Sequence, residues 1–184
     1  CDSTGKILAF RLSTLANTGA YLNNPALLIP LEIMPKVVSS VYHIPALFIE
    51  TRCVLTNTAP IGAYRGAGRP EGIYPLERLM DLAAREMGIS PVTLREINLI
   101  RSESLPYTTQ LGEVFDSGNF HKVMQSAVQK MDWHGFGKRK TASSNNVNAE
   151  AKTSRSTRTT RTTRTKNNNS NNKALSKVHM LLMI

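Results

Sequence analysis

The stretch GAYRGAGRPEGIYPLERLMDLAAREMG, residues Gly62–Gly88, joins two kinds of local sequence. Its first eleven residues contain four glycines and two arginines. Apolar residues then recur with helical spacing, which predicts an amphipathic helix over Pro70–Gly88 that ends at its last glycine. A flexible, positive segment before a helix either makes a tight turn or brings backbone amides close to a bound anion. The surrounding sequence bears on which of the two applies.

Two strands are predicted before this stretch. The segment Lys6–Leu22 begins with alternating apolar residues, and Ala46–Asn57 is an apolar, β-branched run. Prolines interrupt the sequence between the two strands, which predicts an extended crossing segment there instead of a helix. These prolines are Pro25, Pro30 and Pro35.

Three helices are predicted from Pro70 onward. In the first, over Pro70–Gly88, Asp81 and Arg85 are expected to form an i,i+4 ion pair on the polar side. Ser90 is expected to cap the second helix, and the third is predicted over Asn119–Trp133. Its cap is expected to be Ser117 or Asn119. Mixed strands and helices give an α+β fold class.

The excess positive charge is confined to the C-terminal part of the chain. The net charge is +10, yet residues 1–137 hold 12 Lys and Arg against 12 Asp and Glu. The low-complexity composition of residues 138–184 predicts a disordered tail. Its arginines recur every third residue at Arg155, Arg158, Arg161 and Arg164. The tail is interpreted as a nucleic-acid-binding arm, a solvated linker or, as the repeated Thr-Thr-Arg favours, a mistranslated segment.

Cysteine usage and hydropathy exclude other classes. Cys1 and Cys53 form no CxxC pair and no disulfide framework, and the apolar surroundings of Cys53 predict a buried thiol. We find no signal peptide and no apolar run of membrane-spanning length, so a cytoplasmic location without a membrane partner is expected. Because the chain starts at Cys1 and not at Met, it is expected to be a piece of a longer protein.

Spacing alone leaves the role of the glycine-arginine segment open. No Lys-Ser/Thr pair follows its second glycine, so the segment is not a P-loop, and the third glycine of the dinucleotide fingerprint is missing. The helix that begins near Pro70 would add its positive N-terminal end to any anion site. On spacing alone, a structural turn is favoured over such a site.

A longer stretch carries a more specific signal. TNTAPIGAYRGAGRPEGIYPLERLMDLAAREMGISPVTLREINLI, residues Thr56–Ile100, is flanked by TLANTGAYL, VYHIPALFIETRCVLTNT and PYTTQLGEVFDSGNF. Together they resemble the molybdopterin-binding large subunit of the xanthine dehydrogenase, aldehyde oxidase and aerobic carbon monoxide dehydrogenase family, over about residues 3–137. The resemblance implies that residues 1–110 are the C-terminal part of a first molybdopterin-binding domain. Residues 111–137 would start a second, and 138–184 would be the tail.

The resemblance also implies an activity. Family members are molybdenum-dependent hydroxylases that oxidise an aldehyde or a heterocycle, a small-molecule substrate, with oxygen from water. They use a molybdenum-molybdopterin cofactor, in some cases its cytosine dinucleotide form. The implied partners are an iron-sulfur small subunit with 2Fe-2S clusters and an FAD-binding medium subunit. The alternative is a nucleic-acid-binding protein that acts through the arginine-rich tail on a non-catalytic enzyme fragment.

Individual residues of the loop take roles from the resemblance. Tyr64, Arg65, Gly66, Ala67 and Gly68 match the aromatic-Arg-Gly-x-Gly loop beside the molybdenum. Arg65 matches an arginine next to the metal that is not a direct ligand. Ala67 matches a substrate-pocket position that is aromatic in purine-oxidising relatives, which implies a roomier pocket. Gly66 stands where carbon monoxide dehydrogenases carry a copper-binding cysteine, which argues against carbon monoxide as substrate.

Catalytic and metal-ligating residues are not predicted in this chain. Nothing matches the catalytic glutamate that the family carries near the C-terminus of the subunit, so the isolated chain is expected to be inactive. Glu71 is interpreted as a helix-start carboxylate that complements the helix dipole. The four histidines lack ligand-like spacing and are interpreted as packing or solvent-facing residues. They are His43, His121, His134 and His179.

Overall fold

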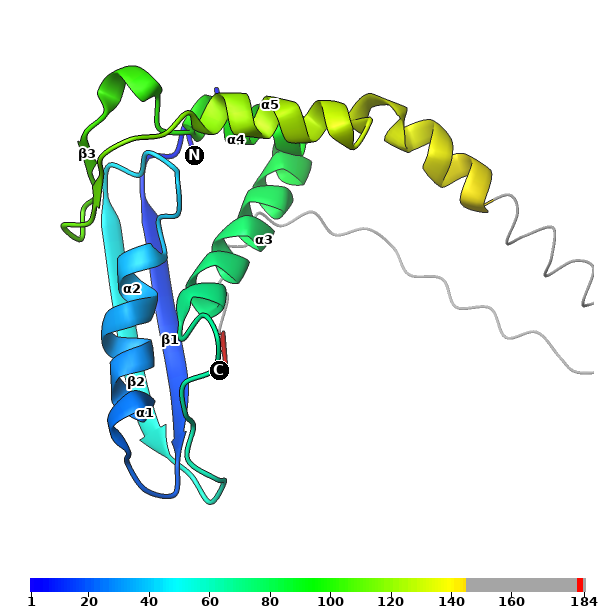
Figure 1. Cartoon of the computed structure of the whole chain (residues 1–184). Coiled ribbons are helices and arrows are strands. Elements are labelled where there is room, and N and C mark those ends of the chain that lie inside the picture. The colour runs from blue at the N-terminus through cyan, green and yellow to red at the C-terminus, as the bar shows by residue number, and fades with distance from the viewer. Residues whose placement is uncertain (145–181, 184) are drawn as a thin grey trace, which may run out of the picture. The chain divides into compact units, whose positions relative to one another are not determined.

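The computed structural model describes residues 1–144 and 182–183 (Figure 1). The chain divides into two compact units, one over Cys1–Lys122 with His179–Ile184, and one over Val123–Val178. The first unit contains the strands, the glycine-arginine loop and most of the helices. No helix in the described part of the chain is long and apolar enough to cross a membrane.

Two parallel strands form the centre of the first unit. β1 (Phe10–Gly19) pairs with β2 (Leu47–Leu55) in a register that begins at Phe10 opposite Leu47, and β5 (Leu182–Met183) pairs with the other edge of β1. Alternate β1 side chains are buried, as the period of two requires. The buried ones are Phe10, Leu12, Thr14, Ala16 and Thr18. Both predicted strands are therefore confirmed.

The segment between these strands is helical, so the predicted extended crossing is wrong. α1 (Asn24–Leu28), a π-helical turn η1 (Ile29–Ile33) and α2 (Met34–Val37) follow one another without a break. Pro25 lies in the first turn of α1, where a missing N–H costs little, and Pro30 and Pro35 lie at the junctions with η1 and α2. Parallel strands also need a crossover connection, and Figure 1 shows α1 and α2 lying along β1 and β2.

The two helices that follow the loop are confirmed. α3 (Arg69–Met87) ends at Gly88, which adopts a left-handed φ of 69°. Its apolar side is buried in the core and includes Leu76, Met80 and Ala84. α4 (Pro91–Asn98) begins at Ser90, whose hydroxyl accepts a hydrogen bond from the Val92 amide at 3.2 Å.

The predicted ion pair between Asp81 and Arg85 is wrong, because α4 offers Asp81 another cation. Arg95 of α4 lies 2.9 Å from Asp81 and 2.7 Å from Glu77, and Glu77 also accepts the hydroxyl of buried Tyr42 at 2.8 Å. Burial opposes the charge of Arg95, but its hydrogen bonds to the two carboxylates raise its pKa overall. Burial, followed by the Glu77 charge, raises the pKa of Tyr42 far above its ordinary value.

A short turn and a small hairpin follow α4. The turn is η2 (Ser102–Ser104), and the hairpin pairs β3 (Tyr107–Thr108) with β4 (Val114–Phe115) in antiparallel fashion. Cys53 is only half-buried, contrary to the predicted buried thiol, because β2 lies at the edge of the three-stranded sheet. Partial burial still raises the pKa of its thiol.

The third predicted helix is confirmed as α5 (Phe120–Lys130), which begins in the first unit and continues into the second. Asn119 caps it, accepting a hydrogen bond from the Lys122 amide at 2.9 Å. The second unit continues through η3 (Trp133–Gly135) into a helix over residues 136–144.

Part of the predicted disordered tail is therefore helical. Within residues 138–144, the Arg139 side chain pairs with Asp132 and donates to the Met131 carbonyl at 2.9 Å, which ties this helix to the end of α5. The remainder of the predicted tail, including its arginine repeat, lies outside the described residues.

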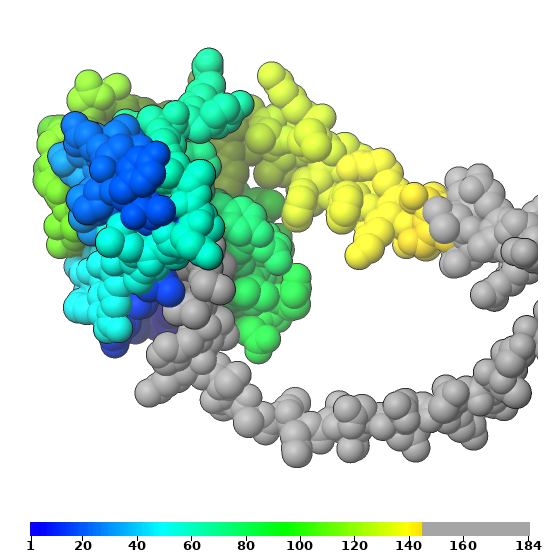
Figure 2. Space-filling model, turned by 90° about the horizontal axis from the view of Figure 1, so that it is seen from below, coloured from blue at the N-terminus to red at the C-terminus, as the bar shows by residue number. Residues whose placement is uncertain are grey.

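The loops that follow β1 and β2 meet at one end of the sheet. The Ala20 amide donates to the Thr58 carbonyl at 3.0 Å, and the Asn17 side chain donates to the Thr58 hydroxyl at 3.1 Å. Figure 2 views the molecule from this end and shows the blue and cyan segments side by side at the surface. The chain passes from this end through Ile61 to the glycine-arginine loop.

Candidate functional site

The five residues predicted to face the cofactor form one turn directly before α3. The Ala67 amide donates to the Tyr64 carbonyl at 2.9 Å, and the Arg69 amide donates to the Gly66 carbonyl at 3.1 Å. Gly66, Ala67 and Gly68 adopt successive left-handed φ angles of 103°, 40° and 90°. A left-handed φ at three consecutive residues reverses the chain tightly and requires residues with small or no side chains.

Packing inside the protein explains the glycine at position 68. A Cβ there would lie 2.9 Å from the Ile29 carbonyl oxygen and 3.1 Å from the Met34 amide nitrogen. Gly72 has the same neighbour, because its added Cβ would lie 3.0 Å from the Met34 carbonyl oxygen. The loop and the first turn of α3 are therefore anchored on the η1–α2 segment, and this part of the motif is structural.

The same turn contains hydrogen-bond donors without a protein acceptor within residues 1–144 and 182–183. Among the described residues, none accepts a hydrogen bond from the Gly66 or Gly68 amides. Gly68 is the N-cap of α3 and provides no side chain to cap the helix, so the first amides of α3 have no side-chain acceptor from the cap position. Arg65 is exposed and makes no ion pair within the described part of the chain, while Tyr64 is 88% exposed. These groups can bind an anion.

Glu71 occupies the first turn of α3, as its interpretation as a helix-start carboxylate requires. One of its oxygens, Oε2, is buried and has no hydrogen-bond partner among the described residues. Glu71 lines a cavity of about 190 Å³, and the other walls of this cavity consist of apolar side chains and backbone atoms. Those walls are Ala16, Ile29, Pro30, Met34, Ile61 and Gly62. The sequence signal was only a carboxylate three residues after the last loop glycine, and the cavity forms where β1, η1 and α2 meet the chain before the loop.

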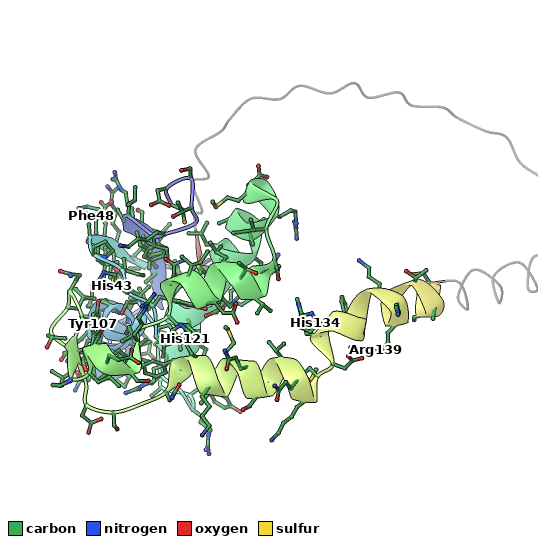
Figure 3. All side chains as sticks on the ribbon, turned by 90° about the horizontal axis from the view of Figure 1, so that it is seen from above. His43, Phe48, Tyr107, His121, His134 and Arg139 are labelled. Carbon is green, nitrogen blue, oxygen red and sulfur yellow. The ribbon has the colours of Figure 1, made fainter. Side chains whose placement is uncertain are left out.

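The histidines contact protein groups. His43 Nδ1 lies 3.1 Å from the Tyr107 hydroxyl, and Figure 3 shows the two side chains next to each other. His121 Nε2 lies 3.1 Å from the Glu96 carbonyl oxygen. Within the described residues, no group of three or more His, Cys, Asp or Glu side chains could hold a metal ion. His179 lies outside the described residues.

Comparisons with known proteins identify relatives over most of the chain. It is 36% identical over 133 residues to the 6-hydroxypseudooxynicotine dehydrogenase complex subunit gamma of Paenarthrobacter nicotinovorans, a match that covers 70% of this chain and 17% of that protein. It is 34% identical over 134 residues to the carbon monoxide dehydrogenase large chain of Hydrogenophaga pseudoflava, covering 70% of this chain and 16% of the relative. The chain thus spans about a sixth of the length of these relatives.

A solved structure and a family model agree with these matches. The crystal structure of quinoline 2-oxidoreductase from Pseudomonas putida 86 superposes with a TM-score of 0.74 at 32% identity, covering 79% of this chain and 19% of that one. The molybdopterin cofactor-binding domain matches residues 1–99, which include β1, β2, the left-handed turn and all of α3 and α4. Since this match takes in more than half of the chain together with the loop, the chain belongs to the molybdopterin cofactor-binding domain family.

Proposed function

We propose that this chain forms one wall of the molybdenum-molybdopterin site in the catalytic subunit of a molybdenum hydroxylase. The observation that carries the proposal is the left-handed turn at Gly66, Ala67 and Gly68, which leaves two amides unpaired among the described residues just before α3. The subunit would oxidise an aldehyde or a heterocycle with oxygen from water, and it would work in the cytoplasm.

The chemistry of the donors fits the cofactor. Molybdopterin carries a phosphate and an electron-rich metal centre, and it supplies the redox chemistry when it is bound. Backbone amides and a guanidinium stabilise such negative charge, and the turn holds these amides in place before any ligand arrives. In this proposal the Gly66 and Gly68 amides and Arg65 bind and orient the cofactor. Ala67 borders the substrate pocket.

The size of the Ala67 side chain bears on the substrate. A methyl group at this position leaves room beside the turn for a bulky ring, where an aromatic residue would fill the space. Two of the relatives carry names that refer to heterocyclic compounds, quinoline and a nicotine derivative. We therefore favour a nitrogen heterocycle over carbon monoxide as the substrate, with an aldehyde as the second choice.

Partner subunits belong to the same proposal. Two relatives are named as the gamma subunit of a complex and as a large chain, which indicates assemblies of several subunits. We propose an iron-sulfur subunit and an FAD-binding subunit as partners, because electrons taken from the substrate must leave the molybdenum site. Large apolar side chains remain exposed on the described surface of this chain, among them Leu22, Phe48 and Leu55.

A chimeric enzyme tests the role of the loop. The segment of quinoline 2-oxidoreductase that matches this chain would be replaced by residues 3–137, and bound molybdenum and quinoline turnover would be measured. We expect Arg65→Gln to lower both at least about tenfold, since it removes one charge-assisted contact. Arg85→Gln, which removes one positive charge in the last turn of α3, away from the loop, is the control. Full molybdenum content in the Arg65→Gln chimera would contradict the proposal.

The isolated chain gives a second test. Because it spans about a sixth of its relatives, we expect the purified 184 residues alone to show no molybdenum-dependent aldehyde oxidation. Turnover above that of a preparation made without molybdenum would overturn this expectation.

A further inference from the structure

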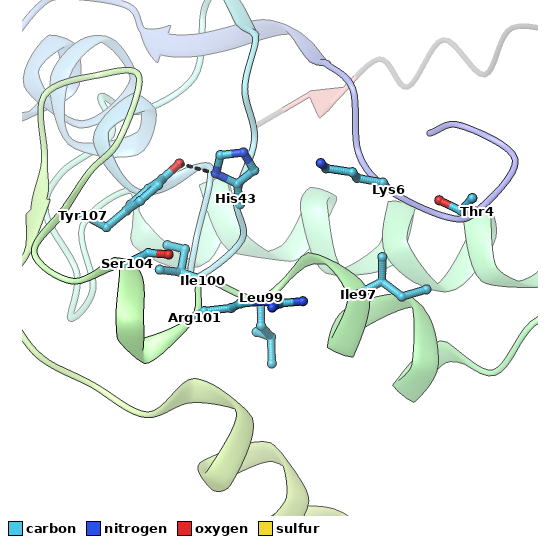
Figure 4. Close-up of a pocket in the computed structure, with 9 residues that line it drawn as sticks. All are labelled: Thr4, Lys6, His43, Ile97, Leu99, Ile100, Arg101, Ser104 and Tyr107. Carbon is cyan, nitrogen blue, oxygen red and sulfur yellow. Dashed lines mark hydrogen bonds between the residues drawn. The ribbon is translucent and has the colours of Figure 1, made fainter.

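A second pocket lies beyond the far end of α3 from the glycine-arginine loop. It has a volume of about 400 Å³ and is lined from the N-terminal loop, from the segment before β2, and from the chain that follows α4 (Figure 4). Its lining residues are Thr4, Lys6, His43, Ile97, Leu99, Ile100, Arg101, Ser104 and Tyr107. This volume is within the range of small-molecule sites.

The pocket combines two cations with an apolar floor. Leu99 and Ile100 are buried beneath it, while Lys6 and Arg101 are exposed and make no ion pair with any described carboxylate. Figure 4 shows the Lys6 side chain pointing toward His43 across the opening. None of the lining residues is acidic. The charge of the pocket is therefore positive, and nothing within its lining neutralises it.

Hydrogen bonds hold the Lys6 backbone at the pocket before any ligand binds. Asn98 is 2% exposed and lies under the loop. Its Oδ1 accepts from the Ile7 amide at 2.7 Å, and its Nδ2 donates to the Gly5 carbonyl at 2.8 Å, so both neighbours of Lys6 are fixed. Asp2 Oδ1 accepts from the Lys6 amide at 3.0 Å and from the Thr4 hydroxyl at 2.7 Å, so this nearby carboxylate is engaged with the loop.

The opposite wall is held in a similar way. The Ile100 amide donates to the Val41 carbonyl at 3.0 Å, and the His43 amide donates to the Asn98 carbonyl at 2.8 Å. The His43 ring meets the Tyr107 ring edge-on, with 5.7 Å between centroids, in addition to the bond between Nδ1 and the hydroxyl. Lys6, Arg101 and His43 thus line one cavity, and backbone contacts hold the segments that carry them.

We propose that this pocket binds a small organic anion, whose oxyanion group pairs with Lys6 and Arg101 while its apolar body lies on Leu99 and Ile100. Directional donors from a guanidinium and an ammonium favour a phosphate or carboxylate group. The apolar floor adds affinity for a ligand with a carbon skeleton over the bare inorganic ion. This site is separate from the proposed cofactor loop, since none of its lining residues belongs to Tyr64–Gly68 or to α3.

Titration of the full 184-residue chain tests the proposal. Phenyl phosphate, benzoate and inorganic phosphate would be added at constant ionic strength, and the backbone amide shifts of Ile7 and Ile100 would be followed by NMR. We expect saturable binding of phenyl phosphate or benzoate, whichever headgroup the site prefers, and weaker binding of inorganic phosphate. The comparison of the first two ligands identifies the headgroup.

Variants separate a built site from general charge attraction. Lys6→Gln and Arg101→Gln should each weaken binding about tenfold. Arg85→Gln lowers the net charge equally but lies outside the lining, so it should leave the affinity unchanged within about twofold. The side chains of Lys6, Arg101 and Arg85 are exposed, and circular dichroism would verify that the variants fold. Shifts that do not saturate, or equal losses in all three variants, would overturn the proposal.

Discussion

Asn98 and the loop at Tyr64–Gly68 lie near opposite ends of α3, and they differ in how many of their polar groups are hydrogen-bonded. Asn98 is buried, and its side chain makes three hydrogen bonds of 2.7–2.8 Å within the chain. In the loop and the first turn of α3, the Gly66 and Gly68 amides and one Glu71 oxygen have no acceptor or donor among the described residues. The first region uses its polar groups to stabilise the fold, whereas the second leaves them without a partner among the described residues, as the proposed cofactor site requires.

The largest expected effect on stability is at Asn98. Asn98→Ala would leave the buried Ile7 amide and the Gly5 carbonyl without their side-chain partner, so we expect a loss of about 3–5 kcal/mol in the free energy of unfolding. Urea denaturation followed by circular dichroism measures it. Asn24→Ala, at an exposed position, is the control and should change stability by less than about 0.5 kcal/mol. A loss below about 1 kcal/mol at Asn98 would remove the contrast between the two regions.

Alanine at three glycines separates packing from backbone strain in the loop region. Gly68→Ala adds a left-handed strain and a clash with the Ile29 carbonyl, so we expect a loss of about 2–4 kcal/mol. Gly88→Ala adds only the strain, because no atom lies within 4 Å of its new Cβ, and should cost about 1 kcal/mol. Gly62→Ala has neither penalty and should be neutral. Equal losses at Gly68 and Gly88 would show that the η1 contact does not anchor the loop.

The buried tyrosine beside Glu77 predicts a dependence of stability on alkaline pH. The pKa of Tyr42 is higher in the folded protein than in the unfolded chain, so the unfolded chain loses its proton first. The contribution of Tyr42 to the free energy of unfolding is fully present below about pH 10. It decreases as the pH rises above this value, by at most about 1.4 kcal/mol per pH unit. Tyr42→Phe should flatten urea-unfolding free energies measured between pH 9 and about pH 11.

Tyr107→Phe is the matched comparison for that experiment. Partial burial raises the pKa of Tyr107 too, in the same direction, but Tyr107 lies on the open pocket whereas Tyr42 is 3% exposed. We therefore expect Tyr107→Phe to change the alkaline slope less than Tyr42→Phe does. Identical slopes in the two variants would argue that neither burial nor Glu77 controls the ionisation of Tyr42.

The smallest effect on stability is expected at Arg65. Its side chain is exposed and makes no ion pair within the described part, so Arg65→Gln should change the free energy of unfolding by less than about 0.5 kcal/mol. The same substitution is expected to reduce the molybdenum content of the chimeric enzyme. A large destabilisation by Arg65→Gln would assign the residue to the fold and not to a ligand.

Local patterns determined those elements whose structure depends on near neighbours. Alternation and β-branched residues located β1 and β2, and helical spacing with Gly88, Ser90 and Asn119 as end signals located α3, α4 and α5. The long, specific resemblance over the loop and α3 also predicted the family. The family model that matches residues 1–99 confirms this prediction. Periodicity and caps act within a few residues, so the sequence alone was sufficient for them.

Tertiary contacts decided the remainder. Three prolines indicated an extended crossing, yet the parallel pairing of β1 with β2 requires a connection that returns across the sheet. Pro25 stands in the first turn of α1, and Pro30 and Pro35 fall at the junctions with η1 and α2. Asp81 pairs with Arg95 and not with Arg85, because α4 brings a half-buried guanidinium to it. The role of Gly68 depends on Ile29, about 40 residues earlier in the chain. Such contacts join residues that are distant in sequence, and no local pattern records which distant segment will fill the space beside a given residue.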